Sequence, residues 1–384
     1  MEVSFFPLAL IAFLALIAHF TSKRIGAPVI VVEILFGVAA GRNALNLIGE
    51  DPVIEFLAFL GFVFLMFLAG LEIDFNQIES HGWGDVLKGL LVFTLMFSLS
   101  YGAALILGYG LLMAIILSTT SLGVVLPTLR SMGISKTREG QSILLMTMVA
   151  DFLAVVILAF YAVWLRDPME LKIYVVLSLF AAYLAAYFIG REAVWHFPDL
   201  LSSWFKPEQP TEVGVRAAIA IMLAFVAYSQ LVGVEEILGA FLAGALLSVL
   251  FRGGSILEEK LYAIGYGFLI PIFFIWVGVN FRFDLLLNKQ GLSIVPPLIA
   301  AAFLVKIIPS VIINYRRLPV KDAIASGILL TSNLSLVIAA VEIGRNLGLI
   351  DAALEAAAIF LAIFTTTLCP VLFRRMSAGT ARPV

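Results

Sequence analysis

Charged residues are scarce in this sequence. Asp, Glu, Lys and Arg make up 13% of its 384 residues, whereas hydrophobic residues make up 62%. A water-soluble domain of this length could not cover its surface with so few charges. Apolar runs of about 18 or more residues recur along the chain, and runs of that length can span a bilayer as helices. We therefore expect an all-α integral membrane protein surrounded by lipid.

Cysteine and histidine are also rare. Cys369 is the only cysteine, which excludes an internal disulfide, and the three histidines show no metal-ligand spacing. The sequence contains no glycine-rich phosphate loop and no Ser-His-Asp arrangement at a common depth. An intramembrane aspartyl protease would need two facing acids at depth, and the sequence offers one. We expect no enzyme, no cofactor and no nucleic-acid partner.

Thirteen membrane spans are predicted from apolar windows that are bounded by Gly, Pro and charged residues. They lie near residues 4–20, 27–47, 56–74, 87–108, 110–130, 141–165, 170–189, 214–232, 235–251, 260–280, 293–314, 321–345 and 350–373.

Positive charges predict the orientation of these spans. Of the 24 Lys and Arg residues, 17 fall on one side of the membrane, 6 fall on the other, and Lys306 lies within a span. Because Lys and Arg are enriched in cytoplasmic loops, we expect the N-terminus outside the cell membrane and the C-terminus in the cytoplasm. The tail after residue 375 is short, so we expect any soluble regulatory domain to be a separate chain.

Three motifs recur in the same order in the two halves of the chain. The pairs are EILFGVAAG (33–41) with EILGAFLAG (236–244), FLMFLAGLEIDF (64–75) with IFFIWVGVNFRF (272–283), and LSTTSLGVV (117–125) with LLTSNLSLV (329–337). They match spans 2, 3 and 5 to spans 9, 10 and 12. Matching spans are seven apart, an odd number, so matching helices cross the membrane in opposite directions. This pattern predicts a five-helix inverted-topology repeat with a substrate site near the membrane midplane.

The third motif pair is rich in small polar residues at mid-span. These residues are Thr119, Thr120, Ser121, Thr331, Ser332 and Asn333. Such side chains compete with the helix for backbone hydrogen bonds, and broken helices are tolerated at this depth only beside a cavity or other protein. We expect two broken, crossing helices whose ends and free carbonyls can coordinate a cation. The alternative is that these small residues only allow close helix packing.

Two ionisable residues lie at the same depth. Asp151 and Lys306 are near the middle of spans 6 and 11, each about 15 Å from either surface at 1.5 Å per residue. Ionisable groups at this depth usually have a function. We predict that Asp151 binds the cation or the proton, and that Thr147, one turn earlier, shares its helix face. A structural ion pair between Asp151 and Lys306 is the alternative.

Four further acids lie in or near spans. Glu33 and Glu236 are repeat mates, and Glu72 and Glu342, nearer to span ends, are candidate accessory acids. For each of them, capping or an interhelical hydrogen bond explains the residue at least as well as transport does.

The motifs together resemble a known transporter family. GAPVIVVEILFGVAAGR, FLGFVFLMFLAGLEID, STTSLGVVLPTLRSMG, VADFLAVVILA and EEILGAFLAGALLS are similar to the cation:proton antiporter 2 family, which includes Na⁺/H⁺ exchangers and Kef-type K⁺/H⁺ systems. The resemblance covers essentially the whole chain. It implies that the family's ion-binding Asp is Asp151, its span-11 basic residue is Lys306, and its crossover Thr-Ser pair is Thr120 and Ser121.

The resemblance also implies a division of the chain into functional bundles. A scaffold that forms a homodimer would comprise residues 1–86 and 214–285, and a mobile core would comprise residues 87–169 and 286–384. Residues 170–213 would provide a linker helix and a cytoplasmic loop.

Ala150 departs from the family pattern. Electrogenic members carry a second Asp at this position, electroneutral exchangers often carry Asn, and Kef-type proteins carry Gln, whereas this chain has Ala. Alanine can neither bind a proton nor pair with Lys306. We therefore expect a monovalent cation/proton antiporter, with Na⁺ as the first candidate cation and K⁺ as the second, that exchanges one proton for one cation at Asp151.

Two other functions on the same scaffold remain as alternatives. A cation channel would conduct without coupling, and a Na⁺-coupled organic-anion symporter would need an anion-sized cavity with basic or amide groups. Only Lys306 and Asn333 offer such groups at the expected depth.

Overall fold

The computed structural model describes most of the chain. The described residues are 5–25, 27–41, 44–49, 51–72, 83–135, 137–166, 169–196, 212–232, 236–250, 255–314 and 319–377. They form helices joined by turns and contain no strand, which confirms the all-α class. Residues 197–211, most of the predicted cytoplasmic loop, lie outside the described residues, as do 73–82 and the tail after 377.

Many of the helices match membrane dimensions. Nine helices within the described ranges are long and apolar enough to cross a membrane. A tenth span results if α17 (Val320–Leu330) and α18 (Ser335–Asn346), which are bent by 44° at a short break, are counted together. Two shorter apolar helices, α2 (Val29–Ala40) and α12 (Glu236–Leu250), accompany them.

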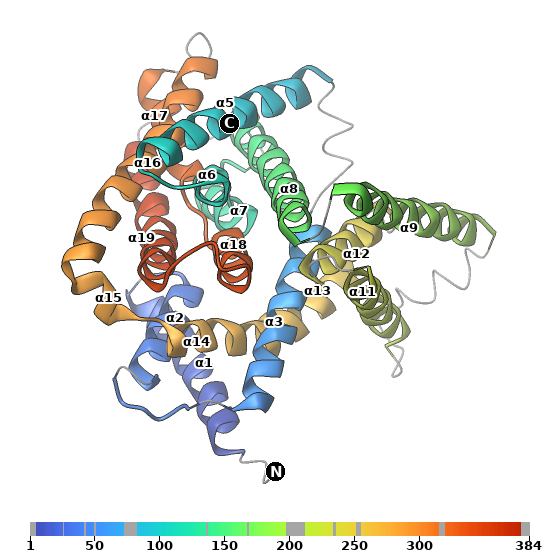
Figure 1. Ribbon diagram of the computed structural model, residues 1–384. Helices are drawn as coiled ribbons and strands as arrows, with labels where there is room; N and C mark the ends of the chain where they lie inside the picture. The colour runs from blue at the N-terminus through green and yellow to red at the C-terminus, as the bar shows by residue number, and fades with distance from the viewer. Residues whose placement is uncertain are drawn as a thin grey trace. The chain divides into compact units, whose positions relative to one another are not determined.

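The chain divides into two compact units, which Figure 1 labels helix by helix. Unit 1 comprises Met1–Asn76 and Ala162–Phe281, and unit 2 comprises Gln77–Tyr161 and Arg282–Val384. Unit 1 contains α1 (Phe6–Ile25), α2, α3 (Pro52–Leu71), α9 (Met169–His196), α11 (Val213–Leu231), α12, α13 (Ser255–Ile264), η1 (Gly265–Leu269) and α14 (Ile270–Asn280). Unit 2 contains α5 (Trp83–Ile106), α6 (Leu111–Ser118), α7 (Leu122–Ser131), most of α8 (Arg138–Arg166), α15 (Phe283–Leu287), α16 (Lys289–Asn314), α17, α18 and α19 (Ala352–Ser377). The short helix α15 was not predicted from the sequence.

Glycines bring α3 and α12 of unit 1 unusually close together. A β-carbon at Gly244 would lie 2.0 Å from the carbonyl oxygen of Phe67, and one at Gly70 would lie 2.1 Å from the carbonyl oxygen of Phe241. No side chain fits at either position, so the two backbones are in direct contact. Small residues allow this kind of packing between membrane helices.

A second glycine contact joins α2 and α14 in the same unit. A β-carbon at Gly37 would lie 2.1 Å from the carbonyl oxygen of Ile275, and one at Gly278 would lie 2.1 Å from that of Ile34. Unit 1 therefore contains two helix pairs that each depend on a reciprocal pair of glycines.

The segment that leads into α14 is a π-helix. In η1 the amide of Ile270 donates to the carbonyl of Gly265, five residues earlier. Pro271 follows at once, and because it has no N–H, it cannot donate to the carbonyl of Gly267, four residues before it. Single π-turns of this kind often occur at functional sites.

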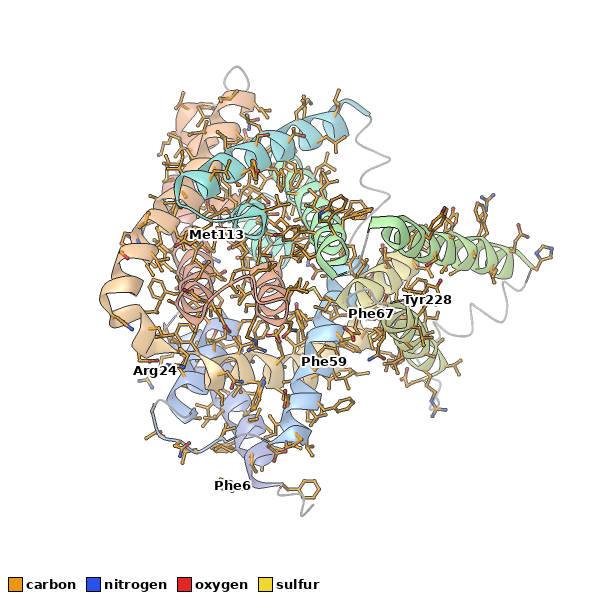
Figure 2. All side chains as sticks on the ribbon, in the orientation of Figure 1. Phe6, Arg24, Phe59, Phe67, Met113 and Tyr228 are labelled. Carbon is orange, nitrogen blue, oxygen red and sulfur yellow. The ribbon has the colours of Figure 1, made fainter. Side chains whose placement is uncertain are left out.

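Apolar side chains cover the outside of the helices as well as their packed faces. Phe67 of α3 is fully buried, whereas Phe59 of the same helix is 42% exposed (Figure 2). Phe6 and Phe20 of α1 are more than half exposed. A helix that is apolar all round fits a lipid environment.

Unit 2 places its two interrupted helices beside each other. α6 and α7 lie next to α18 and α19 (Figure 1). α16 packs tightly on α17, since a β-carbon at Gly327 would lie 2.6 Å from the Cα of Ile307. The breaks in both interrupted helices therefore fall within this unit.

Candidate ion site

The first break separates α6 from α7 at Thr119–Ser121. Thr119 and Ser121 have extended backbone conformations at the end of α6 and at the start of α7. The hydroxyl of Ser118 donates to the carbonyl of Ile115 at 2.9 Å, and that of Thr119 donates to the carbonyl of Ile116 at 2.8 Å. The run of hydroxyl residues thus provides local hydrogen bonds that replace those of a continuous helix.

The second break separates α17 from α18 at Thr331–Leu334. The hydroxyl of Thr331 donates to the carbonyl of Gly327 at 2.9 Å. Ser332 and Asn333 follow with the backbone outside the helix, and both are buried.

Asp151 of α8 lies against the first break. Its carboxylate accepts hydrogen bonds from the Thr120 hydroxyl and, at 2.8 Å, from the backbone N–H of Leu122. Leu122 is the first residue of α7, so the carboxylate caps the positive end of that helix. Asp151 is partly exposed, whereas Thr120 and Thr147 are fully buried.

Thr147 contributes to this site through its main chain. Its carbonyl accepts a hydrogen bond from the Thr120 hydroxyl at 3.3 Å, and its own hydroxyl donates to the carbonyl of Ile143 at 2.9 Å. The sequence places Thr147 on the Asp151 face, but it does not show which of its oxygens points there.

Asn333 joins the two breaks. Its amide nitrogen lies 3.4 Å from the carbonyl of Ile116, 3.1 Å from the carbonyl of Thr119 and 2.9 Å from the Thr119 hydroxyl. The last four carbonyls of a helix have no intrahelical N–H partner; that of Ile116 also accepts the Thr119 hydroxyl. Asn333 therefore supplies, from the other half of the chain, donors that the end of α6 lacks.

Two threonines of α19 that sequence reasoning missed hold Asn333 in place. The hydroxyl of Thr366 donates to the Asn333 carbonyl at 3.1 Å, and that of Thr365 donates to its Oδ1 at 3.5 Å. Both threonines are buried. The run FTTTLCP (364–370) places three threonines within an apolar span, and this pattern could have indicated their polar role.

Lys306 lies in the middle of α16 with no exposed surface. Its Nζ atom is buried and has no hydrogen-bond partner among the described residues. Asp151 uses its carboxylate on Thr120 and Leu122. The Asp151–Lys306 ion pair, which was the alternative interpretation of the sequence, is therefore not formed in this conformation.

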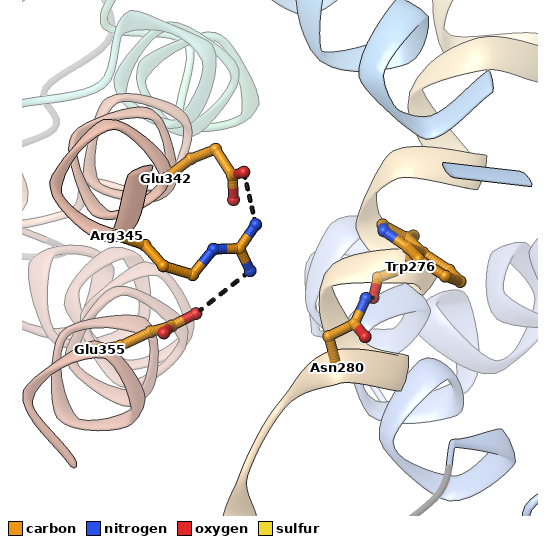
Figure 3. A network of polar contacts seen from close by, with 5 residues as sticks. All are labelled: Trp276, Asn280, Glu342, Arg345 and Glu355. Carbon is orange, nitrogen blue, oxygen red and sulfur yellow. Dashed lines mark hydrogen bonds and ion pairs between the residues drawn. The ribbon is translucent and has the colours of Figure 1, made fainter. Parts of the chain in front are cut away.

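The two candidate accessory acids are not part of this cluster. Glu72 belongs to unit 1, where it accepts a hydrogen bond from the Tyr262 hydroxyl at 2.8 Å. Glu342 lies in the last turns of α18 and pairs with Arg345 at 2.5 Å; the same guanidinium lies 3.7 Å from Glu355 (Figure 3). The Glu72 bond joins two helices, whereas Glu342 pairs with Arg345 within α18.

Known proteins resemble this chain over most of its length. A family model described as sodium/hydrogen exchanger, transmembrane, matches residues 9–377. The chain is 36% identical to the candidate Na⁺/H⁺ antiporter YjbQ of Bacillus subtilis over 94% of its own length, but it spans only 61% of that relative. It is 30% identical to the Na⁺/H⁺-K⁺ antiporter GerN of Bacillus cereus, over 73% of this chain and 72% of GerN.

A solved structure shares the fold. The sodium proton antiporter MjNhaP1 of Methanocaldococcus jannaschii superposes with a TM-score of 0.63, at 15% identity, over 97% of this chain and 96% of that one. Together with the match to the family model across residues 9–377, these similarities show that the chain is a multi-pass membrane protein that belongs to the sodium/hydrogen exchanger family.

Proposed function

We propose that this chain is a secondary active antiporter that exchanges Na⁺ for H⁺, with K⁺ as the second candidate cation. The observation that carries the proposal is Asp151, a single carboxylate that lies at the break between α6 and α7 and accepts hydrogen bonds from Thr120 and Leu122. The names of its relatives support the same substrates, because they are Na⁺/H⁺ antiporters and, for GerN, a Na⁺/H⁺-K⁺ antiporter.

The groups around Asp151 can bind either a proton or a monovalent cation. The Asp151 carboxylate, the Thr120 hydroxyl and the Thr147 carbonyl are hard oxygen donors, which alkali cations prefer. A hydroxyl both donates and accepts, so Thr120 can donate to the empty carboxylate and offer a lone pair to a bound cation. Because one carboxylate carries the binding, a proton and a cation exclude each other.

A one-for-one stoichiometry follows from what surrounds Asp151. Ala150 is buried and offers no second acid, and Lys306 has no hydrogen-bond partner among the described residues. Moving an uncompensated charge through the membrane is costly, so the empty, ionised site crosses rarely. One H⁺ then moves per cation, and the exchange is electroneutral as long as Lys306 keeps its protonation state.

Electroneutral exchange predicts insensitivity to voltage. In proteoliposomes, the rate of Na⁺-driven proton flux should be equal at zero and at strongly negative membrane potential, and repeating the assay with K⁺ and Li⁺ gives the selectivity. A rate that changes with potential would contradict the one-for-one stoichiometry. A channel would instead let the Na⁺ gradient collapse without driving protons.

We also propose the finer architecture expected from the sequence. The ten spans, the two shorter helices α2 and α12, and α9 make thirteen. The glycine contacts support an inverted repeat. Gly70 and Gly278 occupy matching positions of the two sequence repeats. Gly70 packs on α12 and Gly278 packs on α2, and these two helices are also matched by the repeat.

The two compact units correspond in this proposal to a mobile core and a scaffold. Unit 2 holds Asp151, Asn333 and Lys306 and would move during alternating access, while unit 1 would form a homodimer. The direct backbone contacts at Gly70 and Gly244 suit a rigid scaffold. The N-terminus would lie outside the cell membrane and the C-terminus in the cytoplasm.

Replacing Asn333 with Ala should slow exchange about 10- to 100-fold, because a buried acceptor left without its donor costs roughly 1–3 kcal/mol. The variant leaves the Thr119 carbonyl without the amide, whereas the Ile116 carbonyl keeps the Thr119 hydroxyl as a donor. Na⁺-driven proton flux into proteoliposomes measures the effect.

Asn280→Ala is the matched control for this variant. Asn280 is exposed, and its amide donates to the carbonyl of Trp276 in its own helix at 3.0 Å (Figure 3). It should exchange at the wild-type rate. Equal rates for Asn333→Ala and wild type would contradict the role given to Asn333.

A further inference from the structure

Unit 1 contains a buried carboxyl group that the exchange chemistry does not use. Glu33, in the second turn of α2, is 4% exposed, which makes it the most buried carboxylic acid among the described residues. No hydrogen bond or ion pair reaches its carboxylate within the described part of the chain. Leaving a charge unpaired in such a place is costly.

Polar side chains from α13, η1 and the end of α3 form a cluster in the same unit as Glu33. Tyr266 of η1 lies within electrostatic range of both Glu33 and Glu72. Tyr262 stacks on Tyr266, with ring centroids 5.7 Å apart and planes 5° apart, and donates to Glu72 at 2.8 Å. Two tyrosines and Glu72 thus form a polar cluster in the part of unit 1 that lies within electrostatic range of Glu33.

Main-chain geometry in the same segment adds oxygen atoms to this polar cluster. Tyr266 lies within the π-helix, and Pro271 cannot donate to the Gly267 carbonyl. A carbonyl that lacks its α-helical donor can accept a hydrogen bond from a neutral carboxylic acid. The segment that holds Tyr266 therefore offers a hydrogen-bond acceptor within unit 1.

The helices packed on α2 do not offer a cation to Glu33. α14 has no ionisable residue in its sequence, IPIFFIWVGVN. The titratable residues of α1 are His19, Lys23 and Arg24, and all three are exposed. The remaining titratable neighbour, Tyr266, is itself an acid, so no described side chain near Glu33 supplies a positive charge to its ionised form.

We propose that Glu33 is a second proton-binding site, separate from Asp151, which holds its proton at neutral pH. Its proton does not enter the exchange stoichiometry because it lies in unit 1. Release of that proton places an uncompensated charge at a buried position of α2, so the site makes the exchange rate respond to pH through unit 1.

Glu236, the repeat mate of Glu33, provides a matched control. It is the first residue of α12 and is partly exposed. The N–H groups at the start of a helix have no intrahelical partner and stabilise a nearby carboxylate. The same motif residue therefore has opposite surroundings in the two repeats.

Carbodiimide labelling of the full-length protein in membranes tests the proposal. Dicyclohexylcarbodiimide crosses lipid and adds to protonated carboxyl groups; the acid O–H adds across N=C=N, and the product rearranges to a stable N-acylurea with no atom lost. Mass spectrometry should find the adduct on Glu33 at neutral pH, with less at high pH, and none on Glu236. A Glu33 peptide without adduct at every pH would overturn the proposal.

Infrared spectra and pH profiles give independent readouts. The protonated-carboxyl band of the wild type at neutral pH should be lost in Glu33→Gln and kept in Glu236→Gln. Glu33→Gln should also shift the pH profile of Na⁺-driven proton flux. If Asp151→Asn abolishes exchange while the Glu33→Gln band and profile match the wild type, the exchange proposal stands and this one fails.

Discussion

Asp151→Asn should reduce Na⁺-driven proton flux to the level of protein-free liposomes. Asparagine is nearly the same size, and its Oδ1 can still accept the Thr120 hydroxyl, so the break between α6 and α7 should persist. Its amide, however, neither titrates nor carries the charge that attracts a cation. The protein should therefore fold and reach the membrane, but exchange neither ion.

The control for this variant is another Asp in the same unit. Asp284 is exposed and pairs with Arg282 at 3.1 Å, so Asp284→Asn should change flux little because exposed ion pairs contribute about 0–1 kcal/mol. Both variants are reconstituted at equal amounts and assayed with a pH-sensitive dye trapped inside the vesicles. Wild-type flux in Asp151→Asn would show that another group carries the proton.

Gly244→Ala should lower the stability of the purified protein severely. Its new β-carbon would lie 2.0 Å from the Phe67 carbonyl oxygen, and the contact is with backbone on both sides, so no side chain can rotate away. Overpacking commonly costs about 1–3 kcal/mol, and separating α3 from α12 puts this case at or above the upper end. Thermal unfolding in detergent, followed by tryptophan fluorescence, measures the loss.

Gly102→Ala is the comparison for this substitution. Gly102 lies inside α5, and a β-carbon there would meet nothing within 4 Å. Alanine favours helices over glycine by roughly 1 kcal/mol, so this variant should be as stable as the wild type or more so. Equal melting of the two variants would mean that α3 and α12 are not in direct backbone contact.

The sequence predicts the helices of this protein well because apolar length and hydroxyl content are local properties. Both breaks fall at the predicted residues, Thr119–Ser121 and Thr331–Asn333. The π-helix at η1 was not predicted, because it depends on how Pro271 continues into α14.

Contacts across the chain could not be predicted in the same way. Nothing local to Asn333 indicates that its amide reaches Thr119, 214 residues earlier. Glu33 and Glu236 occupy matching motif positions, yet one is buried and the other starts a helix. Their environments differ because tertiary packing, and not the motif, sets burial.

The bond between Asn333 and Thr119 also sets an order of biosynthesis. Asn333 lies 214 positions after Thr119, so at about 5–20 residues per second the ribosome needs roughly 10 to 40 s to reach it. Until then the Thr119 carbonyl has no Asn333 amide to bind. A chain that stops before Asn333 therefore lacks the donor that closes this end of α6.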